Sequence, residues 1–284
     1  MTTSITTSEA TPTVSATRLS ERYREAALNP ATAWNETLDT LIGHRSVRAY
    51  RPDPLPEGTL ELLVAAAQSA PSSSNLQPWS VVVVEDSERK ARLAALAGHQ
   101  KHIVQAPVFL LWLVDLHRLE EVGRALSVPS AALDYLETFL LGAIDTALAA
   151  QNAVVALESL GLGAVYTGGI RNKPAEVAAE LGLPPNVFAL FGLAIGHPDP
   201  AAPASVKPRL PQEAVLFRER YGAPDGGAAA LAAYDQRLRS FQREQGLPER
   251  DWTEQATQRV RGPEALAGRD VLHAVLRGLG FGLK

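Results

Sequence analysis

Cysteine is absent from all 284 residues of the chain. Its absence excludes disulfide bonds, cysteine-bound zinc and thiol redox chemistry. If this protein transfers electrons, a bound cofactor must therefore carry them.

Excess positive charge is absent as well. The chain has 27 basic and 31 acidic residues, a net charge of −4, and no basic block. Nothing in it indicates binding to nucleic acid or to an anionic membrane surface. Any anion must be bound by local groups of arginines, on a chain that is 46% hydrophobic and can bury a substantial core.

Several common site motifs are missing too. The chain has no Walker loop and no Gly-x-Ser-x-Gly elbow, which argues against a P-loop NTPase or an α/β-hydrolase. Gly161-Leu162-Gly163 lies between a predicted helix and a predicted strand, the reverse of the order in a Rossmann turn. His99 and His102 have no third ligand at a recognisable spacing, so no metal site is predicted.

The N-terminus is rich in hydroxyl side chains, with ten Ser or Thr among the first seventeen residues. It has no apolar core or early positive cluster, so it is not a secretory signal, and a cytoplasmic protein is expected. We predict a disordered tail over residues 1–17, a helical leader over 18–37 and one domain over 38–284. That domain includes a C-terminal helical excursion, 212–284.

Helices and short strands are both predicted, which indicates the α+β class. The longest helix, from Ala131 to Leu160, could be a membrane span by length. Its polar residues, such as Asp145 and Glu158, favour a buried central helix at a subunit interface instead. Other helices are expected at Asn35–Ile42, Glu57–Ser69, Ser87–Ala97 (capped by Ser87), Ala228–Gln245, Trp252–Arg261 and Pro263–Leu279, and strands at Trp79–Glu85, Val108–Asp115, Ala164–Thr167 and Phe188–Gly196.

The segment after Ile42 gathers one imidazole, one hydroxyl and two guanidiniums. Gly43 is expected to end the preceding helix in the left-handed conformation. A helix C-terminus carries the negative pole of the dipole, so phosphate bound there needs side-chain charge. Arg45 and Arg48 can supply that charge, with His44 and Ser46 as further donors. The alternative is a surface turn with two solvated arginines.

Seven segments, in this order and spacing, resemble the nitroreductase-like flavoproteins, and among them the NADPH-dependent, FMN-containing nitroreductases and flavin reductases. The resemblance covers roughly residues 38–284. The segments are Gly43-His44-Arg45-Ser46-Val47-Arg48, Ser72-Ser73-Ser74-Asn75-Leu76-Gln77, Gly98-His99-Gln100-Lys101-His102, Asp145-Thr146 with Gln151-Asn152-Ala153, Glu158-Ser159-Leu160-Gly161-Leu162-Gly163, Tyr166-Thr167-Gly168-Gly169-Ile170-Arg171-Asn172, and Lys207-Pro208-Arg209-Leu210-Pro211.

The resemblance implies the nitroreductase fold, a mixed central β-sheet flanked by helices, in a homodimer with FMN at the subunit interface. It places Arg48 near N1 and C2=O of the flavin, and the Gly168 and Gly169 amides near N5 and O4; these three are the catalytic candidates. The full set of implied FMN-binding residues is His44, Arg45, Ser46, Arg48, Ser72, Ser73, Ser74, Asn75, Gln77, Gln100, Tyr166, Thr167, Gly168, Gly169, Lys207 and Arg209. Without the resemblance, the glycines form a simple turn and Ser72–Gln77 an ordinary loop.

Arginines of the C-terminal excursion hold the 2′-phosphate of NADPH in this subgroup. Arg243 matches one by its spacing to Trp252, and Arg250 is the only basic residue near the second position. Arg269 aligns with a further basic position, where a solvated helix arginine is an equally good interpretation.

The implied function is ping-pong, two-electron hydride transfer from NADPH through FMN to nitroaromatics, quinones or free flavin. The alternative is a non-catalytic flavin carrier or sensor. Arg48, Gly168-Gly169 and Arg243 favour the enzyme, because a carrier does not need to bind a nicotinamide nucleotide.

Overall fold

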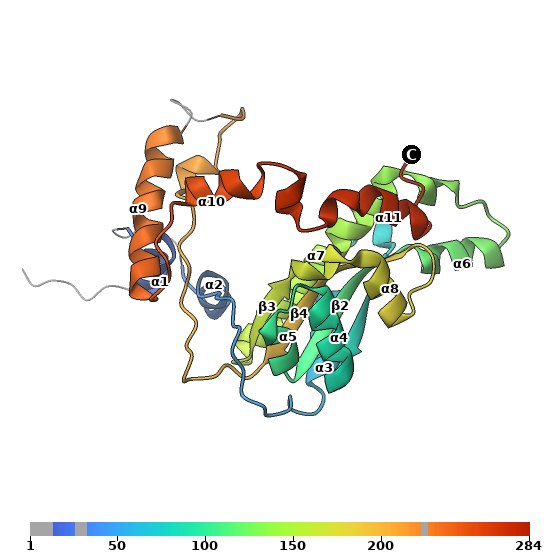
Figure 1. Ribbon diagram of the computed structural model, residues 1–284, viewed down its shortest axis with the longest axis horizontal. Coiled ribbons are helices and arrows are strands. Elements are labelled where there is room, and N and C mark those ends of the chain that lie inside the picture. The colour runs from blue at the N-terminus through green and yellow to red at the C-terminus, as the bar shows by residue number, and fades with distance from the viewer. Residues whose placement is uncertain (1–13, 26–32, 223–226) are drawn as a thin grey trace, which may run out of the picture. The chain divides into compact units, whose positions relative to one another are not determined.

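The computed structural model describes residues 14–25, 33–222 and 227–284, and divides the chain into two compact units (Figure 1). The sheet unit comprises Arg45–Ser205 and Arg259–Lys284. The helical unit comprises the chain up to His44 together with Val206–Gln258.

The sheet unit is built on four strands: β1 (Trp79–Val84), β2 (Val108–Asp115), β3 (Gly163–Thr167) and β4 (Val187–Gly196). Their order is β1-β2-β4-β3, and every neighbouring pair is antiparallel. All eight residues of β2 are buried, because helices cover both faces of the sheet. The parallel pairing expected of a mixed sheet occurs at one bridge, between Ser46 and Ala164 on β3.

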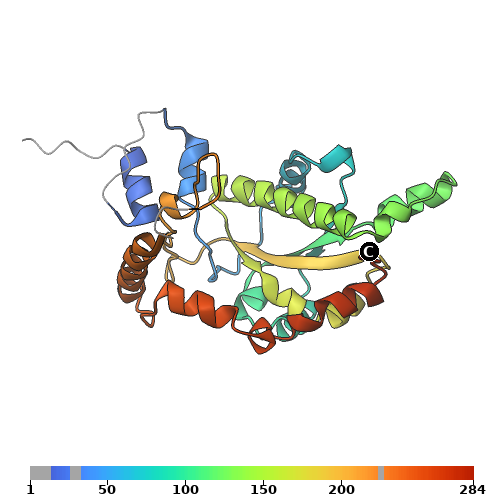
Figure 2. The same ribbon diagram turned by 90° about the horizontal axis from the view of Figure 1, so that it is seen from above.

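Helices α3 (Thr59–Gln68) and α7 (Leu136–Ser159) cover one face of the sheet. Figure 2 shows the long α7 along one side of the strands, with further helices on the other side. Trp112 on β2 packs there with Leu63 from α3 and Leu157 from α7. Within the described residues, α7 is also the one helix long and apolar enough to cross a membrane. Its packing on the sheet is that of a core helix.

The opposite face is covered by α4 (Ser87–Leu96), α5 (Lys101–Gln105) and α8 (Pro174–Leu181). Phe109 on β2 meets Leu93 and Ile103 in this second core layer. A third cluster joins Phe188 on β4 to Phe281 near the C-terminus. The other elements of the sheet unit are the helices α6 (His117–Ala125) and α11 (Leu272–Gly278) and the short turns η1 (Ser73–Asn75), η2 (Ala131–Asp134), η3 (Gly168–Asn172), η6 (Pro263–Leu266) and η7 (Arg269–Val271).

The helical unit contains α1 (Val14–Tyr23), α2 (Glu36–Ile42), the turn η4 (Gln212–Ala214) and α9 (Ala228–Glu244); α10 (Trp252–Arg259) runs to its boundary. Leu238 and Phe241 of α9 are buried. Asp235, also buried on α9, accepts hydrogen bonds from the Thr253 backbone N–H at 3.1 Å and hydroxyl at 2.6 Å, which fixes the start of α10.

The four strands lie where the sequence predicts them, but several details differ. Gly43 is right-handed, with φ of −75°, so the predicted left-handed C-cap is wrong. Its amide continues the helical bonding to the Asp39 carbonyl, and a Cβ there would lie 2.9 Å from that oxygen. The cap of α4 is Asp86, which accepts a hydrogen bond from the Arg89 amide, and not Ser87.

Two predicted helices and the predicted tail are also revised. The first residues of the Ala131–Leu160 helix form η2, and Pro263–Leu279 divides into η6, η7 and α11, with left-handed backbone at Ala267 and Gly268. Residues 1–13 of the predicted tail lie outside the described residues. Residues 14–17 are the first residues of α1, so the predicted tail is wrong at its C-terminal end.

Candidate functional site

In the helical unit, one buried arginine joins segments that are far apart in the sequence. Arg22 of α1 donates hydrogen bonds to the Ile42 carbonyl at 2.8 and 3.2 Å, to the His44 carbonyl at 2.6 Å and to the Lys207 carbonyl at 2.8 Å. Its own carbonyl accepts a bond from the Arg209 amide at 3.1 Å. The structure thus brings together His44, Lys207 and Arg209, three of the predicted FMN-binding residues. Arg22 was not predicted.

In the sheet unit, the chain from Arg45 to Arg48 runs along β3. The Val47 amide donates to the Ala164 carbonyl at 2.9 Å. The Val47 side chain is buried against Gly163, and it fills the space that a Cβ on Gly163 would need. Arg45 and Arg48 remain exposed on either side of this anchor. Neither guanidinium has a carboxylate within ion-pairing distance among the described residues, so both are available to an anion.

A second group of predicted residues meets at the end of β3. Thr167 is buried and is hydrogen-bonded through its hydroxyl to Nε2 of His102 at 2.9 Å. A Cβ on Gly169 would lie 2.4 Å from the Ala97 carbonyl oxygen and 2.7 Å from Nε2 of Gln100. Gly169 is therefore glycine because the backbone just after α4 lies against it, and this contact places Gln100 beside the glycine turn. The predicted Tyr166 is partly exposed next to this turn, with its ring edge-to-face against Phe191.

His102 lies in one of the seven segments but was assigned no role from the sequence, and the structure places it in this group. Burial, and then the nearby Arg48 guanidinium, lower the pKa of His102. The imidazole is therefore neutral at physiological pH, and Arg48 provides the positive charge at this place. No group of three or more potential metal ligands occurs in the described parts of the chain.

Two more arginines lie beside Gly168. A Cβ on Gly168 would lie 3.3 Å from a terminal nitrogen of Arg171 and 3.8 Å from one of Arg269. Burial, and then the proximity of Arg269, lower the pKa of Arg171, which also donates to the Leu190 carbonyl. Arg171 was not assigned a role from the sequence. Arg171 follows Gly168 by three residues in η3, which is one turn of a 3₁₀-helix, so this spacing in the sequence could have located it.

The segment Ser72–Gln77 has a strained backbone that is hydrogen-bonded to the carboxylate of Asp145. Ser74, Asn75 and Gln77 have φ of 50°, 54° and 51°, in the left-handed region. Asp145, buried on α7, accepts a bond from the Ser72 hydroxyl at 2.6 Å and one from the Ser73 amide at 3.3 Å. The same Ser72 oxygen accepts the Gln77 amide at 2.8 Å. Side chains of Ser73, Ser74 and Asn75 are exposed, as a ligand-binding turn requires.

The two predicted nicotinamide-binding arginines differ in their surroundings. Arg243 forms a bidentate ion pair with Glu249, at 2.8 and 2.9 Å, which raises the pKa of Arg243 and lowers that of Glu249. Arg250 is exposed and its amide donates to the Gln242 side chain at 2.7 Å. An exposed ion pair is readily exchanged for another anion, so the pairing does not exclude Arg243 from phosphate binding.

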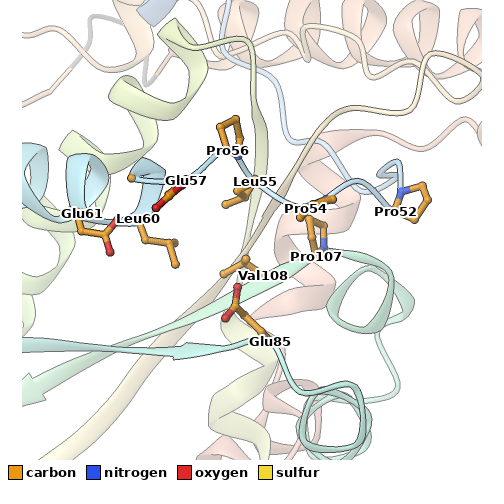
Figure 3. Close-up of a pocket in the computed structure, with 11 residues that line it drawn as sticks. Pro52, Pro54, Leu55, Pro56, Glu57, Leu60, Glu61, Glu85, Pro107 and Val108 are labelled. Atoms are coloured by element: carbon orange, nitrogen blue, oxygen red, sulfur yellow. The ribbon is translucent and has the colours of Figure 1, made fainter.

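A hollow of about 390 Å³ lies beside the end of β1 and the start of β2, and Figure 3 shows the residues that line it. Prolines 52, 54, 56 and 107 line it together with Glu57, Glu61 and Glu85, and none of the predicted site residues does. A second, more open hollow of about 330 Å³ between α4 and α5 is lined by Gln100 and its neighbours His99 and Lys101. Only this second hollow adjoins the predicted site.

The described residues suit FMN in their chemistry. Exposed guanidiniums without carboxylate partners suit an anionic group, and a glycine turn beside an amide side chain suits the polar edge of a flat ring. These features lie on the segments that the resemblance singled out.

Comparison with known proteins agrees with this arrangement. Residues 41–197 match the model of the nitroreductase family, and residues 207–284 match the model of its C-terminal domain. The chain is 41% identical over 223 residues to FMN reductase (NAD(P)H) of Bacillus subtilis, covering 78% of this chain and 89% of that protein. It is 41% identical over 205 residues to an oxygen-insensitive NADPH nitroreductase of Salmonella typhimurium, covering 72% and 82%.

Solved structures show the same fold. The hypothetical oxidoreductase YcnD of Bacillus subtilis superposes with a TM-score of 0.83 at 36% identity, covering 88% of this chain and all of that one. The NADPH:FMN oxidoreductase of Vibrio harveyi, complexed with NAD+, gives a TM-score of 0.78 at 34% identity over the same shares. The expected nitroreductase fold is confirmed. On its sequence and its structure, the chain belongs to the nitroreductase family.

Proposed function

We propose that this protein is an FMN-dependent NADPH oxidoreductase that reduces nitroaromatics, quinones or free flavin. The observation that carries the proposal is the exposed Arg48 guanidinium, which has no carboxylate partner among the described residues and is near enough to His102 to lower the pKa of that histidine. A fixed positive charge there stabilises negative charge on a reduced flavin ring. The names of the relatives, FMN reductase and NADPH nitroreductase, support the same assignment.

FMN, when bound, supplies the chemistry of accepting a hydride and passing two electrons to a second substrate. The protein then has to bind and orient the cofactor, without a nucleophile or a strong base of its own. We assign the phosphate to His44, Arg45, Ser46, Lys207 and Arg209. The ring end is assigned to Arg48, Ser73, Ser74, Asn75, Gln77, Gln100, Tyr166, Thr167, Gly168 and Gly169, with Ser72 shaping the turn that carries Ser73–Asn75.

Two arginines select NADPH by binding its 2′-phosphate. Arg250 binds it directly, and Arg243 binds it after exchanging its ion pair with Glu249 for one with the phosphate. Both arginines are exposed on the helical unit. Charge-assisted bonds between guanidinium and phosphate are the strong kind, and only NADPH offers that group. We place the enzyme in the cytoplasm, where it would draw on the NADPH supply.

We propose a homodimer formed through α7. Leu136, Leu140, Ile144 and Leu148 follow one another at four-residue spacing, and all are exposed in the single chain. Residues at this spacing share one helix face, so they form an apolar stripe of the kind that a second copy buries. The turn at Ser73–Asn75 would then approach the flavin bound mainly by the opposite subunit.

The decisive experiment is stopped-flow reduction of the purified protein. We expect about one FMN per chain, rapid reduction by NADPH, and ping-pong kinetics with a nitroaromatic or quinone acceptor. Arg48→Ala should lower the flavin midpoint potential and slow reduction at saturating FMN. Arg45→Ala should mainly weaken FMN retention, with turnover restored by added FMN.

Bound FMN that neither NADPH nor NADH reduces would indicate the alternative function, a flavin carrier or sensor. The assignment of Arg48 to the ring and Arg45 to the phosphate would be wrong under one pair of results. In that case Arg48→Ala keeps the wild-type midpoint potential and reduction rate, whereas Arg45→Ala loses both at saturating FMN.

A further inference from the structure

We propose that helix α1 is a strap that holds the FMN-phosphate segments together, with Arg22 as the positioning residue. The inference rests on the proposed function, because it assumes that His44, Lys207 and Arg209 bind the phosphate. Each of these three residues has a backbone atom hydrogen-bonded to Arg22: the carbonyls of His44 and Lys207 and the amide of Arg209.

Arg22 hydrogen-bonds to two segments that are far apart in the sequence. His44 follows α2, whereas Lys207 lies 185 residues beyond Arg22 in the chain. The guanidinium is planar and presents its donors in a fixed fork, so it sets the spacing of the carbonyls it binds. Arg22 is 7% exposed, and the Ile42 carbonyl it also binds belongs to the last turn of α2, where helix carbonyls lack partners.

Helix α1 is fixed to the helical unit at further points, as a strap must be. Arg18 forms a bidentate pair with Asp39 of α2, at 2.8 and 2.9 Å, which lowers the pKa of Asp39. Arg24, just past the end of α1, pairs with Glu244 of α9 at 2.6 Å and lies over the Phe241 ring. These contacts hold the helix without touching the phosphate segments.

The strap lies outside the part of the chain that the family models match, which begins at residue 41. The solved relatives are covered completely by 88% of this chain, so they also account for less than its full length. Helix α1 precedes the residues that the family models match. Its contacts suggest what it does: it orders the two phosphate segments before the ligand arrives, which reduces the entropy lost on binding.

The test compares FMN with riboflavin, which has the same ring but no phosphate. Dissociation constants are measured by flavin fluorescence on full-length protein freed of flavin, for the wild type and Arg22→Met. Loss of charged hydrogen bonds predicts FMN affinity lower by about tenfold or more, with riboflavin affinity and the flavin midpoint potential unchanged. Arg22→Lys, which keeps the charge but not the fork, should recover only part of the loss.

Arg24→Met is the matched control, since it removes an arginine contact of the same segment that does not involve phosphate residues. It should leave the ratio of FMN to riboflavin affinity at the wild-type value. An unchanged ratio in Arg22→Met would overturn the proposal, and so would an equal loss of both flavins, which would make Arg22 a general folding residue. A wild type that binds both flavins equally also overturns it, whereas failure of NADPH to reduce bound FMN refutes the proposed function alone.

Discussion

At the scale of single residues, the burial of His102 affects its charge state. Its pKa is lowered first by burial and then by Arg48. In the unfolded chain a histidine titrates near pH 6.5. As the pH falls through that value, the unfolded state gains a proton before the folded state does. The free energy of unfolding therefore decreases as the pH falls below about 6.5.

We predict that Arg48→Ala raises the pKa of His102 while leaving it below the ordinary value, because burial remains. Titration of the histidine ring resonances by NMR measures this directly. In urea unfolding between about pH 6.5 and 5, His102→Gln should show a smaller decrease in stability than the wild type. A pKa of His102 that is equal in wild type and Arg48→Ala would show that the two side chains do not interact.

Ser72 shows how the count of hydrogen-bond donors limits a residue's role. A serine hydroxyl has one proton, and here the proton is donated to Asp145. Ser72 therefore has none left to donate to a flavin, while Ser73, Ser74 and Asn75 are exposed. We expect Ser72 to shape the turn and the three neighbours to make its direct contacts with the ligand.

At the scale of elements, the turn after α3 depends on α7. Three residues of this turn are held at positive φ, which costs roughly 1–3 kcal/mol each for non-glycine residues, and Asp145 provides two of the bonds that fix it. Asp145→Asn should lose a charge-assisted bond and speed FMN release by about tenfold. The rate is measured by dilution of the holoenzyme.

Asp235→Asn is the control for this prediction. Asp235 is also buried on a helix and also accepts one hydroxyl and one backbone amide, but at the start of α10. We expect it to lower the melting temperature without changing FMN release. Equal release rates for the wild type and Asp145→Asn would mean that the turn keeps its shape without the carboxylate.

Elements with a strong local pattern were predictable from the sequence. Strand β2 was predicted to the residue because its apolar run is bounded on both sides. Short α5, α6 and α8 were missed, since five to nine residues give only a weak periodic signal, although α2 and α10, of similar length, were predicted. Arg22, and the pairing of His102 with Thr167 over 65 residues, could not be predicted, because contacts between distant segments leave no local pattern.

At the scale of the whole molecule, we predict that the apolar stripe of α7 forms the dimer. Ile144→Glu places a charge in the middle of the stripe and should yield monomers that retain little FMN, as measured by sedimentation and flavin absorbance. Val122→Glu, at an exposed apolar residue of α6, should remain dimeric and retain FMN. A wild-type monomer that keeps its flavin would contradict the assignment of this surface.

The hydrogen bond between Arg22 and Lys207 also constrains when the protein can acquire its cofactor. The helical unit is made of two segments that are separated in the sequence by most of the sheet unit: the first ends at His44 and the second begins at Val206. During synthesis, helix α1 leaves the ribosome well before its partner exists. Contacts of such sequence separation form late, because closing the intervening loop costs entropy before any contact compensates for it. On this basis a nascent chain shorter than about 207 residues should not retain FMN, and flavin loading should follow, not accompany, folding of the sheet.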